Sequence, residues 1–478
     1  MEQDIEGCER TELSLSGFRS MQTIFDRLVK KTPISAMVRA AMENILSPNF
    51  IDGIFRSTAN IQSERQLLFS TIVEVMCLVV CKIKPSVHAA FLHLEEFIDV
   101  SAKSVYNKIN KVEPEVSRQL VCQSSARVKE VIVELDVLNE SPIPGYKVRI
   151  IDGNHHPASH HRLGVLRDVA AAPLPGLSLV VYDPVHGVVL DCLPCEDGHK
   201  QERALIPEIF NEIEPGTVWI ADRNFCTCAF MFELELHKAF FVVRRHSLTC
   251  VEIKGPPIAC GRVATGTVSE QPVEVTDVNG HRRSYRMITL VLDKPTRDGD
   301  LQIQILTNLP ESVSALVITV SYRSRWKIEN VNLELMKHFA SEQTSLGNPP
   351  ATLFAFCVSI IAFNLVQLVH ASLRAAHGEE ATADKISNYY LAHALQDGWE
   401  STHLIDETFW IEKYSSLTPK QLAAELILIA KNVRLSQFRK SKRGPKKPPT
   451  PRTRFRDTPH VSTYKLLNNL VDSEEIKS

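Results

Sequence analysis

The chain has 478 residues, of which 44% are hydrophobic and 23% charged, the composition of an ordinary globular protein of about two to four domains. Its first ten residues lack a basic segment followed by an apolar run, so we expect no secretory signal. The 11 cysteines are scattered and odd in number, which favours reduced thiols in a reducing cytoplasm over a disulfide-built secreted fold.

The formal net charge of −2 conceals a strong asymmetry along the chain. The stretch from Arg434 to Lys465 contains 11 Lys and Arg against a single acidic residue, Asp457, which gives +10. The rest of the chain has 43 basic and 55 acidic residues, or −12. A basic block on an otherwise acidic protein indicates a polyanionic partner, with a merely solubilising tail as the alternative.

Residues 1–140 are expected to form a helical N-terminal domain, because apolar residues recur at helical spacing and glycines are few. Ser101 is the expected N-cap of a helix from Ala102 to Val112 that follows another helical segment. This pattern predicts a helix-turn-helix that reads DNA, while a helical hairpin used only for packing is the alternative. The outward residues expected to bind DNA are Lys103, Asn107 and Lys108.

A linker containing Pro142 and Pro144 leads into residues 145–246. There, three β-type runs are followed by a helical segment, a fourth β run, a helical segment and a fifth β run. This order is that of the ribonuclease H-like fold, an α/β class in which the first and fourth strands are neighbours.

Two aspartates end the first and fourth of these runs. Asp152 ends VRIID and Asp222 ends TVWIAD. A buried carboxylate is costly without a partner, and a divalent cation is a good one. The sequence therefore predicts that Asp152 and Asp222 are neighbouring metal ligands.

Residues 247–320 are dense in β-formers, turns and glycine, and we expect them to form a β-rich insertion. Asn279-Gly280 lies between two β runs and predicts a hairpin. Residues 321–375, which follow, are expected to be helical and to complete the core.

The stretch YRSRWKIENVNLELMK, from Tyr322 to Lys337, has helical periodicity with an unusual stripe. At about 100° per residue, Tyr322, Arg325 and Glu329 share one side with two apolar residues. Such a stripe is expected in a helix that lies over an active site and provides one carboxylate ligand to a metal ion. An i,i+4 ion pair on a solvated helix is the alternative.

Four sequence blocks stand in the order DGNHH, EDGHKQERAL, ADRNF and YRSRWKIE. Together with the order of Asp152, Asp222 and Glu329, they resemble the DDE transposases of bacterial insertion sequences, specifically the insertion-sequence-four family. The resemblance covers roughly Gly145 to Arg374. It implies that the three carboxylates are catalytic metal ligands and that the Tyr and Arg of the fourth block, Tyr322 and Arg325, bind phosphates near the cut.

The resemblance implies an enzyme that binds the terminal inverted repeats of its own element, cuts the DNA ends by metal-dependent hydrolysis and joins the 3′-hydroxyl ends to target DNA. Two Mg²⁺ ions, replaceable by Mn²⁺, would assist this chemistry. The expected partners are double-stranded DNA and a second copy of the chain, without a membrane or a small-molecule substrate. The expected location is the bacterial cytoplasm, at the nucleoid. A decayed or domesticated copy that only binds DNA, or a nuclease without strand transfer, remains open.

One position departs from the family pattern. The family has a Lys seven residues after the Glu, where this chain has Met336, and the nearest Lys is Lys337. In a regular helix Met336 lies about 20° from Glu329, whereas Lys337 lies about 80° away on the other side. A one-residue π-bulge would return Lys337 to the face of Glu329, so that it could bind DNA phosphates, and we expect such a bulge.

The most apolar segment, Ala351 to Leu373, is nearly long enough to span a bilayer, but polar residues in its second half favour a buried helix packed on a sheet. Residues 376–433 are expected to be helical. Residues 434–478 are expected to form a basic, disordered tail. The tail residues expected to bind DNA are Lys442, Arg443, Lys446 and Lys447.

The histidines after Asp152 and two cysteine pairs raise the question of a zinc site. No cysteine pair stands beside the histidines, so contact with DNA or with neighbouring loops is the favoured role for them. Structural thiols are favoured for the cysteines. The residues concerned are His155, His156, His160, His161, Cys192, Cys195, Cys226 and Cys228.

Overall fold

The computed structural model describes residues 21–60, 66–296, 299–382, 385–441 and 459–468. It has a mixed α/β architecture with a helical N-terminal region and a mixed sheet, consistent with a ribonuclease H-like core. The chain divides into two compact units. The first consists of Met1–Leu138, Ala158–Arg167 and Glu334–Pro459, and the second of Asn139–Pro157, Asp168–Leu333 and His460–Ser478.

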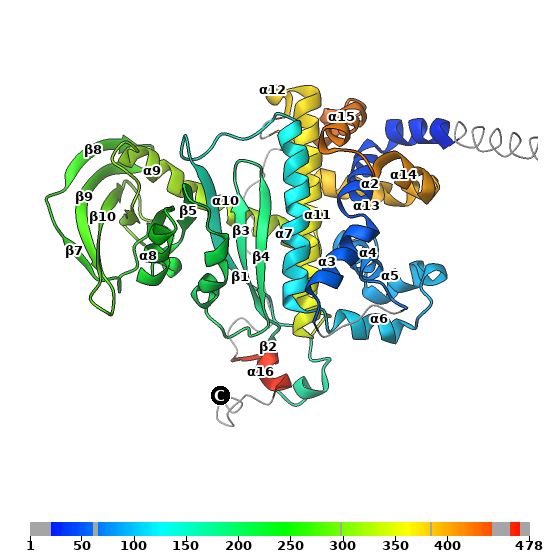
Figure 1. Ribbon diagram of the computed structural model, residues 1–478, viewed down its shortest axis with the longest axis horizontal. Coiled ribbons are helices and arrows are strands. Elements are labelled where there is room, and N and C mark those ends of the chain that lie inside the picture. The colour runs from blue at the N-terminus through cyan, green and yellow to red at the C-terminus, as the bar shows by residue number, and fades with distance from the viewer. Residues whose placement is uncertain (1–20, 61–65, 297–298, 383–384, 442–458, 469–478) are drawn as a thin grey trace, which may run out of the picture. The chain divides into compact units, whose positions relative to one another are not determined.

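The first unit is helical, and α11 (Pro349–His377) is its central helix (Figure 1). Helices α7 (Pro114–Glu134), α15 (Pro419–Ala430) and α4 (Phe69–Val80) pack against it. Its most apolar window is 94% buried inside the structure, so a helix long and apolar enough for a membrane span is used here as a core helix. The expectation of a buried helix is confirmed, and the partners of α11 within this unit are helices.

Further helices of the first unit are each shorter than the central helix α11. They are α2 (Pro33–Ile45), α3 (Pro48–Thr58), α5 (Val87–His93), α6 (Ala102–Ile109), α12 (Glu379–Thr382), α13 (Asn388–Thr402) and α14 (Glu407–Tyr414).

The expected helix pair before α7 is present as α5 and α6. Ser101 caps α6 as predicted, since its side chain accepts a hydrogen bond from the Ser104 N–H at 3.3 Å. The helix ends at Ile109, three residues earlier than expected. Glu113 is extended because it precedes Pro114, the first residue of α7, and this leaves no room for a longer α6.

The second unit is built on a ten-stranded sheet with the order β4-β3-β1-β5-β6-β11-β10-β9-β7, and β8 pairs with β9. Strands β1, β5 and β6 are parallel neighbours, whereas the other pairs are antiparallel. The strands are β1 (Lys147–His155), β3 (Leu177–Asp183), β4 (Val188–Cys195), β5 (Thr217–Ala221), β6 (Phe240–Arg244), β7 (Val251–Ile253), β8 (Ile258–Val263), β9 (Gly266–Thr276), β10 (Arg282–Leu292) and β11 (Gln302–Thr307).

The strands within residues 247–320 extend the same sheet, because β11 returns to pair antiparallel with β6. Figure 1 shows these strands curving away from the first five. The predicted hairpin at Asn279-Gly280 joins β9 and β10 and is confirmed. Gly280 has a φ of 84°, the left-handed conformation that such a turn requires, and Asp277 Oδ1 accepts hydrogen bonds from two backbone N–H groups of the turn.

One face of the sheet is covered by η3 (Glu202–Glu212) and α8 (Cys228–Leu236), whose apolar residues pack with buried strand residues such as Trp219 and Phe241 in one core. The sequence predicted a helical segment between the third and fourth β runs. The structure has instead a 3₁₀-helix beginning at Glu202, with Pro207 in its interior. Pro207 has no N–H to donate and clashes with the preceding turn of an α-helix, which accounts for the difference.

The stretch predicted as one helix from Tyr322 to Lys337 is also corrected. Helix α9 (Ala315–Tyr322) ends at the Tyr, a 3₁₀ turn η5 (Arg323–Arg325) follows, and α10 (Trp326–His338) carries Glu329. The predicted stripe of Tyr322, Arg325 and Glu329 is therefore not the face of one regular helix, because the 3₁₀ turn lies between Tyr322 and Glu329. The expected π-bulge is absent from the described residues of α10, which is α-helical throughout.

Candidate active site

The two aspartates lie at the same level of adjacent parallel strands. Ile150 of β1 pairs with Ile220 of β5, and Asp152 and Asp222 each lie two residues further along. Side chains two residues apart in a strand point to the same face, so both carboxylates face the same side of the sheet. The predicted adjacency is confirmed. Contrary to expectation, β1 does not end at Asp152 but continues to His155 by pairing with β3.

Backbone groups fix one oxygen of each aspartate. Asp222 caps the 3₁₀ turn η4 (Arg223–Phe225), because its Oδ1 accepts a hydrogen bond from the Asn224 N–H at 2.7 Å. Asp152 Oδ1 accepts from the Gly153 N–H at 3.1 Å. Both side chains are thereby oriented by the chain that immediately follows them.

Arg325 connects Glu329 with this pair. Its Nη1 lies 2.7 Å from Glu329 Oε1 and 3.9 Å from Asp152 Oδ2. The i,i+4 ion pair considered from the sequence is therefore present, but it faces a buried carboxylate instead of open solvent, since the Arg325 and Asp152 side chains are only 12% and 15% exposed. Tyr322, at the end of α9, is buried as well, and burial raises its pKa to about 12.

The electrostatics of the site favour a cation. Burial, opposed by the Arg325 guanidinium and reinforced by the nearby carboxylates, raises the pKa of Asp152 to about 7. These carboxylates belong to Asp222, Glu202 and Glu329. A divalent cation would relieve this repulsion, and the donors are hard anionic oxygens of the kind that Mg²⁺ and Mn²⁺ prefer. The residues present therefore fit a divalent metal.

The three carboxylates enclose a wider space than the ligands of one ion usually do. Among the described residues, one group of three ligand atoms lies within 4.8 Å of one another, and it consists of His93, Glu400 and His403 in the first unit. Within the second unit, Asp152, Asp222 and Glu329 are linked through Arg325 and through their mutual electrostatic effects.

Glu202 was not singled out from the sequence, although it belongs to the block EDGHKQERAL. The first residue of η3, it acts electrostatically on Asp152, and its Oε2 accepts a hydrogen bond from Asn224 Nδ2 at 2.8 Å. The signal available in the sequence was the position of this Glu within one of the four blocks of the family resemblance. Its proximity to Asp152 depends on strand pairing, which the sequence alone does not reveal.

A group of basic residues near Asp222 was also missed. Arg223 follows Asp222, Arg244 ends β6, the parallel neighbour of β5, and Arg245 comes directly after it. With His246 and Asp300 they line a cavity of about 510 Å³. The sequence showed these residues as RRH at the end of a β run, without showing that this run lies beside the one ending in Asp222.

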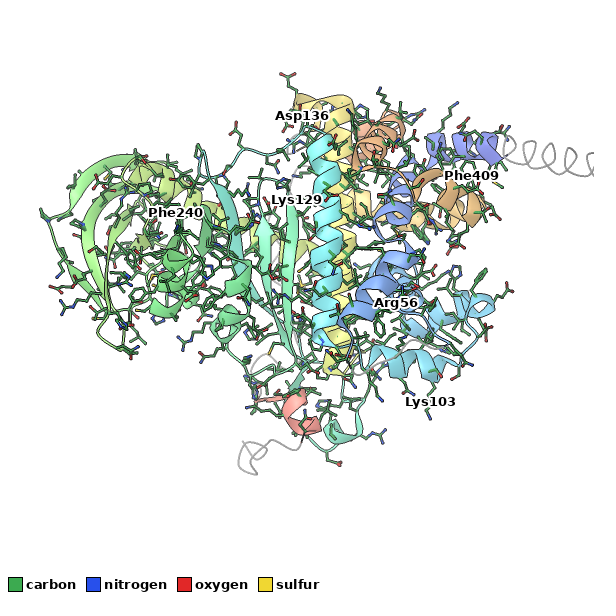
Figure 2. All side chains as sticks on the ribbon, viewed as in Figure 1. Arg56, Lys103, Lys129, Asp136, Phe240 and Phe409 are labelled. Carbon is green, nitrogen blue, oxygen red and sulfur yellow. The ribbon has the colours of Figure 1, made fainter. Side chains whose placement is uncertain are left out.

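The residues predicted to bind DNA occupy different surroundings. Lys103 and Asn107 are exposed on α6, and Lys103 points away from the helices of its unit (Figure 2). Lys108 is half-buried, where its Nζ donates to the Leu67 carbonyl and lies 4.8 Å from the Phe55 ring centre. Lys337 is exposed on α10. The tail residues Lys442, Arg443, Lys446 and Lys447 lie outside the described residues.

The histidines and cysteines do not gather into a zinc site among the described residues. His156 is buried with Nε2 at 2.9 Å from Ser178 Oγ, and burial lowers its pKa to about 3, so it is a neutral structural residue. None of the four cysteines concerned forms a disulfide in the structure.

Comparison with known proteins agrees with this geometry. Residues 144–365 match a family model, the transposase DDE domain, and the matched range contains Asp152, Asp222 and Glu329. No curated protein matches the chain.

Proposed function

Because residues 144–365 match the transposase DDE domain, a domain of metal-dependent phosphoryl transfer, we propose that this enzyme is a transposase of the insertion-sequence-four family. It binds the terminal inverted repeats of its element, hydrolyses a phosphodiester at each end and joins the freed 3′-hydroxyls to target DNA. The domain match supports metal-dependent phosphoryl transfer on DNA; the insertion-sequence-four family, the binding of terminal repeats and the joining step are proposed in addition.

The observation that carries this proposal is the register of β1 and β5. Asp152 and Asp222 follow Ile150 and Ile220, which pair directly, and a third carboxylate, Glu329, reaches Asp152 through Arg325. A purely structural role would not explain why several carboxylates gather around the buried Asp152, whose pKa is raised to about 7 by burial and, to a smaller extent, by these neighbours.

The chain's own residues perform distinct tasks in this proposal. Asp152, Asp222 and Glu329 hold two divalent cations, Mg²⁺ or Mn²⁺, and bound cations supply Lewis-acid activation of the phosphate and of the attacking oxygen. Arg325 has a forked guanidinium suited to a phosphate oxygen beside the cut, and Tyr322 supports its position from the end of α9.

DNA contacts beyond the cut are assigned to the helical region and the tail. Lys103, Asn107 and Lys108 of α6 would contact the terminal repeats, as the sequence predicted, and Lys337 would contact phosphates near α10. The basic stretch around Lys442 would add contacts that do not depend on sequence. We expect two copies to act on paired ends, in the bacterial cytoplasm at the nucleoid.

A paired assay tests the proposal. The full chain is given duplexes carrying the DNA that flanks its gene, either intact or already cut to a 3′-hydroxyl, with supercoiled target DNA and Mg²⁺. A transposase cuts the first substrate and joins the second. Cutting without joining would identify a nuclease, and specific binding with neither reaction would identify a copy that only binds DNA.

A further inference from the structure

Glu202 is held against both strands that carry the catalytic aspartates. It follows β4 as the first residue of η3, and its side chain is only 16% exposed. Its Oε2 accepts a hydrogen bond from Asn224 Nδ2 at 2.8 Å, and the same Asn224 donates its backbone N–H to Asp222 Oδ1 at 2.7 Å. Asn224 thus fixes the distance between the two carboxylates.

The contact of Glu202 with β1 is equally close. Its Oε1 lies 3.5 Å from His155 Nε2, three residues after Asp152. At Gly153, a Cβ atom would lie 2.1 to 2.4 Å from three side-chain atoms of Glu202, which no real contact permits. Glycine directly after Asp152 is therefore required so that the Glu202 carboxylate can approach β1.

Hydrogen bonding alone does not explain a carboxylate at this position. A glutamine would accept the same hydrogen bond from Asn224 without a charge. A further negative charge held this close to β1 and to Asp222 is a cost in the absence of a cation, because like charges repel. The cost is offset if the charge contributes to holding a cation.

We propose that Glu202 is a fourth carboxylate of the metal site, which binds a divalent cation together with Asp152 and Asp222. This inference rests on the proposed function, since it adds a ligand to the same site. It makes Glu202 a ligand from the segment after the third antiparallel strand, in addition to the two aspartates and the helical Glu329.

Manganese binding to the full chain tests the role of Glu202 without any need for DNA cleavage. Mn²⁺ affinity and stoichiometry are measured by titration calorimetry and by loss of the free-ion spin-resonance signal for wild type, Glu202→Gln and Asp222→Asn. The matched control is Glu212→Gln, an exposed Glu on the same 3₁₀-helix. We expect Glu202→Gln to weaken at least one site about tenfold or more, and Glu212→Gln to leave binding unchanged.

Thermal unfolding separates a lost ligand from a damaged fold. Glu202→Gln retains the acceptor for Asn224, so without metal its melting temperature should equal or exceed that of the wild type, while the rise produced by Mn²⁺ should shrink. Wild-type Mn²⁺ binding by Glu202→Gln would overturn this inference. Wild-type binding by Asp222→Asn would instead overturn the metal site of the proposed function, so the two failures are distinguishable.

A separate observation concerns the cavity beside Asp222. Val243 of β6 pairs with Ala221 of β5, so Arg244 stands level with Asp222. Arg244 Nη2 is paired with Asp300 Oδ2 at 2.6 Å, but Arg245 has a neutral partner, Gln304 Oε1, at 2.8 Å. Its Nε is buried without a hydrogen-bond partner among the described residues.

The positive charge of the residues that line this cavity therefore exceeds their negative charge. Three arginines, Arg223, Arg244 and Arg245, face one carboxylate, Asp300. An unsatisfied buried guanidinium N–H and excess positive charge call for an anion with several acceptor oxygens. We infer that the cavity binds a backbone phosphate of the DNA, adjacent to the phosphate at which the strand is cut. This inference also rests on the proposed function.

The salt dependence of DNA binding tests this second site. Affinity for end DNA is measured over a series of salt concentrations in Ca²⁺, so that cleavage does not interfere. Arg245→Gln should lower the slope of log K against log salt by about one, and Arg262→Gln, an exposed arginine on β8 paired with Asp293, should not. An unchanged slope for Arg245→Gln would overturn the inference, whereas a wild-type chain that does not bind DNA would overturn the proposed function itself.

Discussion

Arg325 Nη1 lies 2.7 Å from Glu329 Oε1, one helical turn further along the chain, and the same nitrogen lies 3.9 Å from Asp152 Oδ2. The short 3₁₀ turn before α10 makes this possible, because it directs Arg325 toward the sheet while Glu329 follows in the regular helix. One guanidinium therefore connects the start of α10 with β1.

Replacement of Arg325 should impair cleavage more than it impairs folding. Arg325→Lys keeps a charge but loses the planar guanidinium whose Nη1 lies near both carboxylates, so we expect the cleavage rate to fall about tenfold to a hundredfold. Arg323→Lys, at an exposed position two residues earlier, is the control and should cleave normally. Equal rates for the two variants would show that the guanidinium does not position Glu329.

The raised pKa of Asp152 predicts how the metal-free protein responds to pH. The carboxyl titrates near 7 when folded and near 3.9 when unfolded, so the folded state holds the proton more tightly. The contribution of this carboxyl to stability should then be greatest below about pH 4, fall by on the order of 4 kcal/mol as the pH rises to about 7, and stay level above that.

Asp152→Asn removes this titration. In a chelator, the variant should be more stable than the wild type at pH 8, and the difference should shrink at pH 5, because the wild-type carboxyl is then protonated. Chemical unfolding at the two pH values provides the measurement. Stability curves of wild type and variant that run parallel between pH 5 and 8 would contradict the assignment of the raised pKa to Asp152.

Helix α10 predicts little role for Lys337 in cleavage. The helix has no π-bulge, so Lys337 stays to the side of Glu329 and Met336 lies closer to its face. Lys337→Ala should cut DNA within about twofold of the wild-type rate, and Met336→Lys should cut faster because it restores a cation near the phosphate. A large loss in Lys337→Ala would mean that the helix is rearranged when DNA binds.

Helix α6, which we propose contacts the terminal repeats, offers a contrast between neighbouring side chains. Lys103 and Asn107 are exposed on α6, whereas Lys108 contacts the Phe55 ring and the Leu67 carbonyl. Replacement of Lys103 and Asn107 by Ala should erode the preference for end DNA over random DNA with no change in melting temperature. Lys108→Ala should lower the melting temperature, since it loses buried contacts. Competition binding and thermal unfolding of both variants decide the matter.

The sequence predicted the parts of the site that depend on local pattern. The adjacency of Asp152 and Asp222, the cap at Ser101 and the Asn279-Gly280 hairpin all follow from residue type and spacing, and the structure has them. It did not predict features that depend on pairing between distant segments. Glu202 and Arg245 come close to Asp222 only because β5 lies between β1 and β6.

Two of the predicted helices differ from the structure because a proline or a tighter turn interrupts the α-helix. Pro207 turns an expected α-helix into a 3₁₀-helix, and the 3₁₀ turn at Arg323–Arg325 breaks a pattern with continuous helical periodicity. Periodicity reports which residues share a face over several turns, but a single tighter turn changes the direction of that face without changing the pattern of apolar residues.

The cleavage rate of Asp222→Asn tests the central claim most directly. It is measured on duplexes carrying the flanking DNA of the gene, in Mg²⁺, with DNA affinity and melting temperature determined on the same preparation. We predict cleavage at least about a hundredfold slower than wild type with unchanged affinity and fold, because an amide cannot replace the anionic metal ligand. Cleavage within a few-fold of the wild-type rate would contradict the assignment of Asp152, Asp222 and Glu329 as the catalytic metal site.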